Sequence, residues 1–172
     1  MEAHDIHGKA VGQRSLLQKI GNFVPGFRGY QKREEWREVD ATQRTWCAEK
    51  LTGSKEKVKR ALNDVIAGGD LDGITPFEKL MGRLDTVANK IKNADRGWSG
   101  MFDTIKVEEH QLEKVYQFDL SLAEGVTEVE KAIDSLGSSD KDTSLKLVRE
   151  ATDLVSKLEE YFAKREEIMR KG

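Results

Sequence analysis

The sequence predicts an all-α protein: an up-down antiparallel bundle of four main helices, preceded by an N-terminal helical arm. Apolar residues recur three and four positions apart over long stretches, which is the spacing of one helix face. No stretch shows the extended alternation of apolar and polar residues that is typical of a strand. The segments between the helical stretches are short, and short connections favour antiparallel neighbours. At 172 residues, the chain is long enough to bury a core.

We predict an arm or short helix over residues 1–26 and a helical bundle over residues 27–172. The arm's apolar residues stop at Pro25-Gly26, a pair that breaks helices, so its helix is expected over about residues 10–24. These apolar residues are Leu16, Leu17, Ile20, Phe23 and Val24.

The first bundle helix is predicted from about Phe27 to residue 67. Its apolar stripe passes through Val39, Cys47 and Leu51. Gly53-Ser54 leaves two interpretations open, because Gly can end a helix and Ser can cap the next one. The pair either separates two helices or only kinks one.

The second bundle helix is predicted to start at Thr75 and to end near Asp95. Thr75 is a good N-cap, Pro76 suits the first helical position, and Glu78 completes a capping box. The apolar stripe of this helix is Phe77, Leu80, Met81, Leu84, Val87, Ala88 and Ile91.

Two further helices follow a connector at residues 96–103. The third is predicted from near Val107 to Leu136, and Gly125 should weaken it by about 1 kcal/mol relative to Ala. Residues 137–140 form a turn, with acidic residues that suit turns and N-caps. The last helix then carries its stripe from Leu145 to Phe162.

Composition and charge bound the function. The net charge of −2 gives no reason to expect nucleic acid, and a single cysteine excludes an intrachain disulfide. No signal peptide and no apolar run long enough to span a bilayer are evident. We therefore expect a cytoplasmic protein, with peripheral association at the inner face of the membrane left open.

No catalytic, metal or cofactor site is predicted. None of the three histidines, His4, His7 and His110, has a Glu three positions before it, as a di-iron bundle requires. Cys47 lies on an apolar stripe, where cysteine is usually a small buried hydrophobe. The acidic segment from Asp70 has Met81 where a calcium loop needs a Glu. We expect no enzyme.

Residues 28–60 carry ten basic and six acidic residues, which leaves a local charge of +4. Arg28, Lys32, Arg33 and Arg37 are spaced to share a helix face. This face could meet phosphates, anionic lipid or an acidic partner. The alternative, which we favour, is a solvated face that Glu34, Glu35 and Glu38 neutralise locally.

Two motifs resemble those of a group of small bacterial all-helical proteins. They are residues 25–34 (PGFRGYQKRE), which fit P-G-[FY]-x-G-Y-x-x-R-E, and residues 94–103 (ADRGWSGMFD), which fit A-D-x-G-[WY]-x-G-x-F-D. Residues 113–125 also fit the group. Such proteins are associated with band-7/SPFH membrane scaffolds and have no assigned activity. The resemblance therefore implies an accessory or scaffold role and no catalytic residues.

Glycines bracket aromatic residues in both motifs, and glycine permits close backbone approach. We expect Tyr30, Trp98, Met101 and Phe102 to form one aromatic cap at the end of the bundle where the first helix begins. The cap would either plug that end or form a docking surface. The residues predicted for interaction are Phe27, Arg28, Tyr30, Arg33, Trp98, Met101 and Phe102.

The leading hypothesis is a non-enzymatic helical interaction or scaffold protein, an accessory subunit of a larger bacterial assembly. It would bind an unidentified protein partner, and homo-oligomerisation is left open. The second hypothesis is a peripheral membrane protein that binds anionic lipid through residues 10–37. The third is an enzyme of unfamiliar type, which a deep pocket with convergent polar groups would favour.

Overall fold

A computed structural model describes residues 2–29, 36–69, 73–94, 109–138 and 140–171. Over these ranges the regular structure is entirely helical, which confirms the all-α prediction. The elements are α1 (Glu2–Phe23), α2 (Trp36–Ala67), α3 (Ile74–Asn93), α5 (Glu109–Asp134), the short 3₁₀ helix η2 (Ser135–Ser138) and α6 (Lys141–Lys171).

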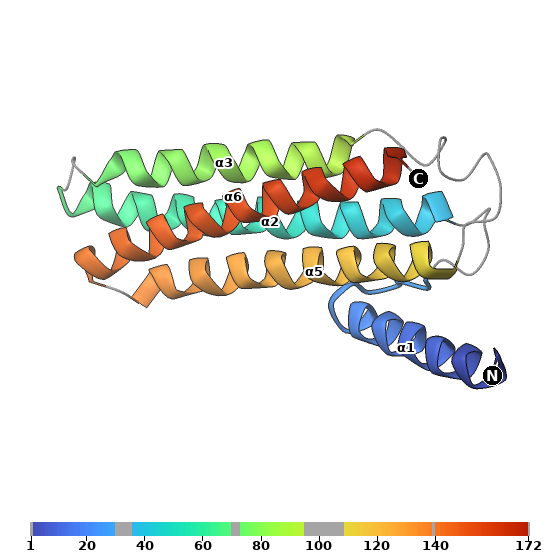
Figure 1. The fold of residues 1–172 in the computed structure, drawn as a ribbon. Helices are drawn as coiled ribbons and strands as arrows, with labels where there is room; N and C mark the ends of the chain where they lie inside the picture. The colour runs from blue at the N-terminus through green and yellow to red at the C-terminus, as the bar shows by residue number, and fades with distance from the viewer. Residues whose placement is uncertain (1, 30–35, 70–72, 95–108, 139, 172) are drawn as a thin grey trace.

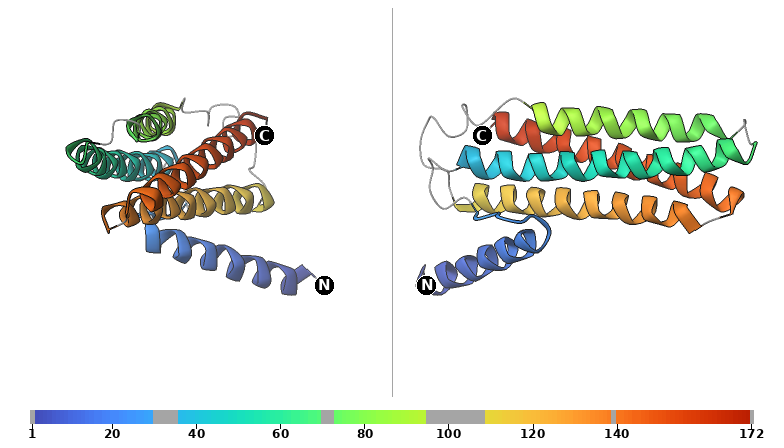
Figure 2. Two further views of the ribbon diagram at one scale, coloured as in Figure 1. Left: turned by 90° about the vertical axis from the view of Figure 1, so that its left-hand side faces the viewer. Right: turned by 180° about the vertical axis from the view of Figure 1, so that it is seen from behind.

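The bundle consists of two helical hairpins packed side by side. Helices α2 and α3 form one hairpin and α5 and α6 the other, while α2 also packs on α5 and α3 on α6. Successive helices run in opposite directions, so α3 ends and α5 begins at the end of the bundle where α2 begins (Figure 1). Helix α1 lies outside the bundle and packs against α5 (Figure 2).

The apolar stripes predicted from the sequence form the core. On α3, six of the predicted residues are buried, at spacings that keep them on one helix face. On α5 the stripe from Val115 to Ile133 is buried in the same way, and on α6 it continues through Val148, Val155 and Phe162. The buried residues of α3 are Phe77, Leu80, Leu84, Val87, Ala88 and Ile91.

Helix α2 differs from its prediction at its N-terminal end, and it decides between the two interpretations of Gly53-Ser54. It is continuous through Gly53-Ser54, so this pair does not separate two helices. The predicted start at Phe27 is wrong, because residues 27–29 are not helical and Gly29 has φ +75°. Right-handed helix requires negative φ, so Gly29 interrupts the chain before α2.

The start of α3 is also corrected. The helix begins at Ile74, and the N-cap is Gly73, which makes no side-chain cap hydrogen bond. The predicted cap at Thr75 and its capping box with Glu78 are therefore wrong. Pro76 now occupies the third helical position, where its missing N–H costs nothing, because the first four N–H groups of a helix have no partner inside it.

The predicted cap before the last helix is confirmed. Asp140 accepts hydrogen bonds through Oδ1 from the backbone N–H groups of Asp142 (3.1 Å) and Thr143 (3.2 Å), and through Oδ2 from the Thr143 hydroxyl (2.7 Å). These bonds favour the carboxylate and lower the pKa of Asp140. Among the described helices, none combines the length and apolarity needed to cross a bilayer.

Candidate interaction site

The arm is joined to the bundle by a small apolar core of its own. Ile20 and Val24 are fully buried, and Phe27, just beyond the helix, is nearly so. They pack against Val115 and Tyr116 of α5, apart from the main core. Among the side chains that the structure describes, those of the last turns of α1 and of the residues just after it join the arm to the bundle.

Gly29 is the tightest point of this joint. Phe27 meets the ring of Tyr116 edge-on, with ring centroids 6.4 Å apart and planes at 75°. A Cβ atom at Gly29 would lie 2.3 Å from Leu17 Cδ2 and 2.9 Å from the Tyr116 hydroxyl oxygen. The joint therefore requires glycine at position 29 for two reasons: there is no space for a Cβ atom, and φ is positive.

Beyond the joint, α1 diverges from the bundle, and its N-terminus is the part farthest from it (Figures 1 and 2). Arg14 and Lys19 are exposed on it, and Arg28 is exposed just after it. None of these three cations makes an ion pair with another described residue. The bundle behaves differently, because pairs such as Lys55–Asp85 (2.6 Å) and Arg83–Glu159 (2.9 Å) bridge its helices.

Positive charge is concentrated in residues 6–33, which include part of the arm and the residues that follow it, whereas α1 itself carries only +1 because it also contains Glu2 and Asp5. No Asp or Glu occurs between Ile6 and Arg33, while six basic residues do, so this segment carries +6. Since the whole chain carries −2, all other residues together carry −8. The lack of Asp and Glu between Ile6 and Arg33 marks this segment in the sequence. The predicted basic segment, residues 28–60, contains six acidic residues and does not show it. The six cations are Lys9, Arg14, Lys19, Arg28, Lys32 and Arg33.

A groove of about 490 Å³ lies beside the base of the arm, between the turn at Pro25 and α2. Exposed Glu38 and Glu49 are among its lining residues, and neither makes an ion pair with another described residue. Half-buried Trp46 supplies its largest side chain, and Lys50 Nζ lies 5.9 Å from that ring. Its other lining residues are Ala41, Thr42 and Thr45.

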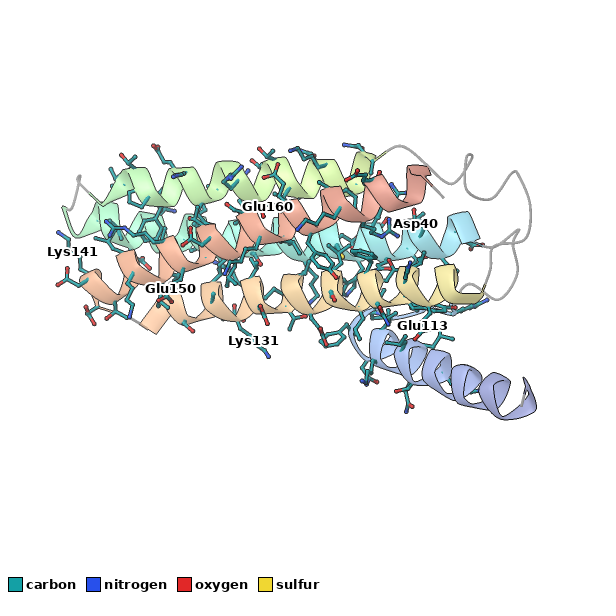
Figure 3. The ribbon with its side chains drawn as sticks, in the orientation of Figure 1. Asp40, Glu113, Lys131, Lys141, Glu150 and Glu160 are labelled. Carbon is teal, nitrogen blue, oxygen red and sulfur yellow. The ribbon has the colours of Figure 1, made fainter. Side chains whose placement is uncertain are left out.

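Within the described residues, four charged side chains are buried inside the bundle, and the sequence analysis did not predict them. Arg165 of α6 is 2% exposed, and its Nη2 lies 2.6 Å from Asp40 Oδ1 of α2. Its Nε donates to Asp119 Oδ1 of α5 at 3.0 Å. Arg44 Nε donates to Asp40 Oδ2 at 2.7 Å. Figure 3 places Asp40 in the half of the bundle where α2 begins and α6 ends.

This four-residue charge cluster (Asp40, Arg44, Asp119 and Arg165) also makes hydrogen bonds to the end of α3, the remaining bundle helix. Arg44 Nη1 donates to the carbonyl oxygen of Ala94, at the end of α3, at 2.8 Å. Gln43 Nε2 donates to the carbonyl oxygen of Asp119 at 2.8 Å, while Gln43 Oε1 is buried without a partner among the described atoms. The cluster therefore contacts all four bundle helices and is electrically neutral.

Cys47 lies next to the cluster and is fully buried, as predicted. Burial, and secondly the nearby carboxylate of Asp119, raise the pKa of the Cys47 thiol well above its ordinary value. A thiol with a raised pKa is a poor nucleophile, because the thiolate is the reactive form. This environment suits a structural cysteine.

A second cavity, of about 350 Å³, lies at the opposite end of the bundle. Asp64, Lys141 and Ser144 contribute polar atoms to a wall that is otherwise apolar or glycine. No histidine or cysteine is among its described lining residues.

Of the residues predicted for interaction, the structure places two. Phe27 is buried in the joint of the arm, and Arg28 is exposed but not on α2, so it does not continue that helix face. The expected aromatic cap and its two interpretations lie outside the described residues, as do the acidic residues at 70–72. The predicted residues outside the described ranges are Tyr30, Arg33, Trp98, Met101 and Phe102.

Comparison with known proteins returns no family, no curated protein and no solved structure that matches this chain. Within the described residues, no three His, Cys, Asp or Glu side chains are grouped so as to hold a metal ion.

Proposed function

We propose that the chain is a non-enzymatic helical interaction protein, an accessory subunit of a larger assembly, and that α1 is its partner-binding element. The observation that supports this role is the exposure of cations on the arm that have no ion-pair partner among the described residues. Arg14 and Lys19 are exposed and unpaired within the described residues, on a helix that leaves the bundle. Exposed, unpaired cations attract acidic surfaces and speed their association.

Site-specific photo-crosslinking in the source cells tests the proposal. A crosslinking amino acid replaces exposed Gln18 on α1 in one strain and exposed Lys79 on α3 in a matched control strain. We expect crosslinked protein adducts from position 18 and few from position 79. Equal or absent adducts at both positions would contradict a partner-binding role for the arm.

The acid-free segment also favours a second candidate function, peripheral association with anionic lipid. Basic residues near an anionic bilayer contribute about 1 kcal/mol each to binding. The apolar residues Ile20 and Val24 are buried in the joint, so this binding would rest on charge rather than on insertion. Co-sedimentation with phosphatidylserine-containing vesicles tests it, and no binding at low salt would end it.

A further inference from the structure

We infer that the bundle surface beneath the arm is a binding site for an amphipathic helix of another protein, and that α1 occupies this site until the partner displaces it. The inference goes beyond the proposed function, which concerns the exposed cations of the arm, and does not depend on it. It rests on how the arm is seated: an apolar helix face lies on an apolar surface of a bundle whose own core is separate.

The arm presents its apolar side chains as a helical ligand does. Leu17, Ile20 and Val24 follow one another at spacings of three and four, which places them on one helix face. The backbone N–H of Val24 donates to the carbonyl oxygen of Ile20 at 2.9 Å and so extends the last turn. Phe27 continues the spacing and is buried. Peptide helices that bind in apolar grooves use the same pattern of anchors. The opposite face of the arm is polar and exposes Ser15, Gln18, Lys19 and Asn22.

The receiving surface comes from two bundle helices. On α5 it includes Tyr116, Leu120 and Ala123, which again share one helix face. Val39 of α2 belongs to the same apolar cluster, and half-buried Trp46 packs against it. The surface therefore combines aromatic and aliphatic side chains, and aromatic residues are enriched where proteins bind one another.

The bundle does not use the arm to build its main core. Within the part of the chain that the structure describes, that core comes from α2, α3, α5, η2 and α6, and its buried residues include none from α1. The arm lies on the outside of the bundle (Figure 2). Displacing it would therefore uncover an apolar patch and leave the four-helix core in place. Contiguous apolar patches on a surface mark interaction sites.

The helical state of the arm depends on its docking. Most helical stability in proteins comes from tertiary packing rather than from intrinsic propensity, and Gly12 and Gly21 lower the propensity of α1 further. Elements with few buried apolar contacts open at a lower free energy than the core of the same protein. A partner helix with the same anchors can therefore compete with α1 for the surface.

Fluorescence anisotropy with two labelled peptides tests the inference on the full chain. The anchor peptide consists of Ala, Glu, Lys and Gln, except for apolar anchors at the spacing of Leu17, Ile20, Val24 and Phe27. The control peptide has Asp at the positions that correspond to Ile20 and Val24. Because the anchor peptide shares only its anchors with the arm, its binding reports on amphipathic helices as a class.

Three variants of the chain complete the design. The undocked variant, Ile20→Asp with Val24→Asp, places charges in the joint. The control variant, Ser15→Asp with Gln18→Asp, makes the same charge change on the exposed face of α1. The third variant adds Leu120→Asp to the undocked variant and so damages the receiving surface itself. Circular dichroism checks that each variant is folded.

We expect the undocked variant to bind the anchor peptide at least about tenfold more tightly than the wild type does, because the arm no longer competes for the surface. The control variant should bind as the wild type does, and Leu120→Asp should abolish binding. In the wild type, the anchor peptide should displace the arm and speed trypsin cleavage after Lys19. The control peptide should do neither.

The inference is overturned if the undocked variant does not bind the anchor peptide, if the wild type binds it equally tightly, or if the control peptide binds as well. If the undocked variant fails to fold, the wild type decides: trypsin cleavage that does not rise with the anchor peptide overturns the inference. An undocked variant that dimerises instead of binding the peptide would assign the surface to a second copy, and one that binds only lipid vesicles would assign it to a membrane. Both results exclude a partner helix, and neither affects adducts from position 18.

Discussion

Replacing Arg165 with Met should be among the most damaging single changes available to the bundle. The guanidinium is 2% exposed and contacts Asp40 and Asp119, at 2.6 and 3.0 Å. Without it, two buried carboxylates share one remaining cation, Arg44. Removing one partner from a buried ion pair costs about 3–5 kcal/mol, because a buried charge is left uncompensated. For a chain of this length, that lowers Tm by about 10 °C.

Urea unfolding followed by circular dichroism measures the loss. The matched control is Lys57→Met, because the Lys57–Asp134 pair is exposed (37% and 56%) and bridges helices in the same way. An exposed pair contributes about 1 kcal/mol or less, so this control should barely move the unfolding midpoint. Similar losses in the two variants would refute the assignment of a large penalty to burial.

A double variant separates charge from packing. Asp119→Leu combined with Arg165→Met removes one charge of each sign and leaves the Asp40–Arg44 pair intact. Exchanging a buried ion pair for apolar groups is often nearly neutral. We expect the double variant to lie within about 2 kcal/mol of the wild type. A loss equal to the sum of the two single losses would show that the cluster acts through packing alone.

Three smaller perturbations test other parts of the structure. Gly29→Ala should destabilise the joint by about 2 kcal/mol and expose α1 to trypsin. The control, Gly26→Ala, is also at positive φ but has nothing within 4 Å, so it should cost only about 1 kcal/mol. Equal trypsin sensitivity of the two variants would contradict the close approach of Gly29 to Leu17 and Tyr116. Cys47 should react with a thiol reagent only as fast as the protein unfolds, because burial raises its pKa and blocks access; rapid labelling of the native protein would argue against burial. Asp140→Ala should lower Tm by a few degrees at neutral pH and much less in acid, because the pKa of Asp140 is lower in the folded protein than its ordinary value near 3.8. The stability that this carboxylate adds is complete above that ordinary value and is lost as the pH falls through the folded-state pKa. An unchanged Tm difference at pH 2 would contradict this, and Asp140→Asn is the control that keeps the cap while removing the charge.

The helices were predictable because their signals are local. The stripe from Phe77 to Ile91 depends only on neighbours three and four positions away, and so does the cap at Asp140. The start of α3 was placed two residues late, with the N-cap at Thr75 instead of Gly73, because Thr75 and Glu78 form a good capping box in isolation. The structure uses buried Gly73 as the N-cap instead, without a side-chain cap hydrogen bond, so the capping box does not decide where α3 begins.

The charge cluster was not predicted because its members are far apart in the sequence. Asp40 and Arg165 are separated by 125 positions, and each resembles an ordinary surface residue. A signal did exist: Asp119 falls in the apolar stripe between Tyr116 and Leu122, and Arg165 follows Leu158 and Phe162 at helical spacing. A charged residue in register with a buried stripe indicates a buried partner, but the sequence does not say which one.

The buried charge cluster also determines which alignment of the helices is allowed. Apolar side chains of similar size would tolerate α6 sliding along its neighbours, because one leucine contact can replace another. Arg165 permits no such exchange. A shift of one helical turn, about 5.4 Å, would carry its guanidinium away from both carboxylates and leave three charges buried among apolar groups. The cluster thus selects one register for α2, α5 and α6, and thereby fixes where the end of the bundle that carries the arm stands relative to α6.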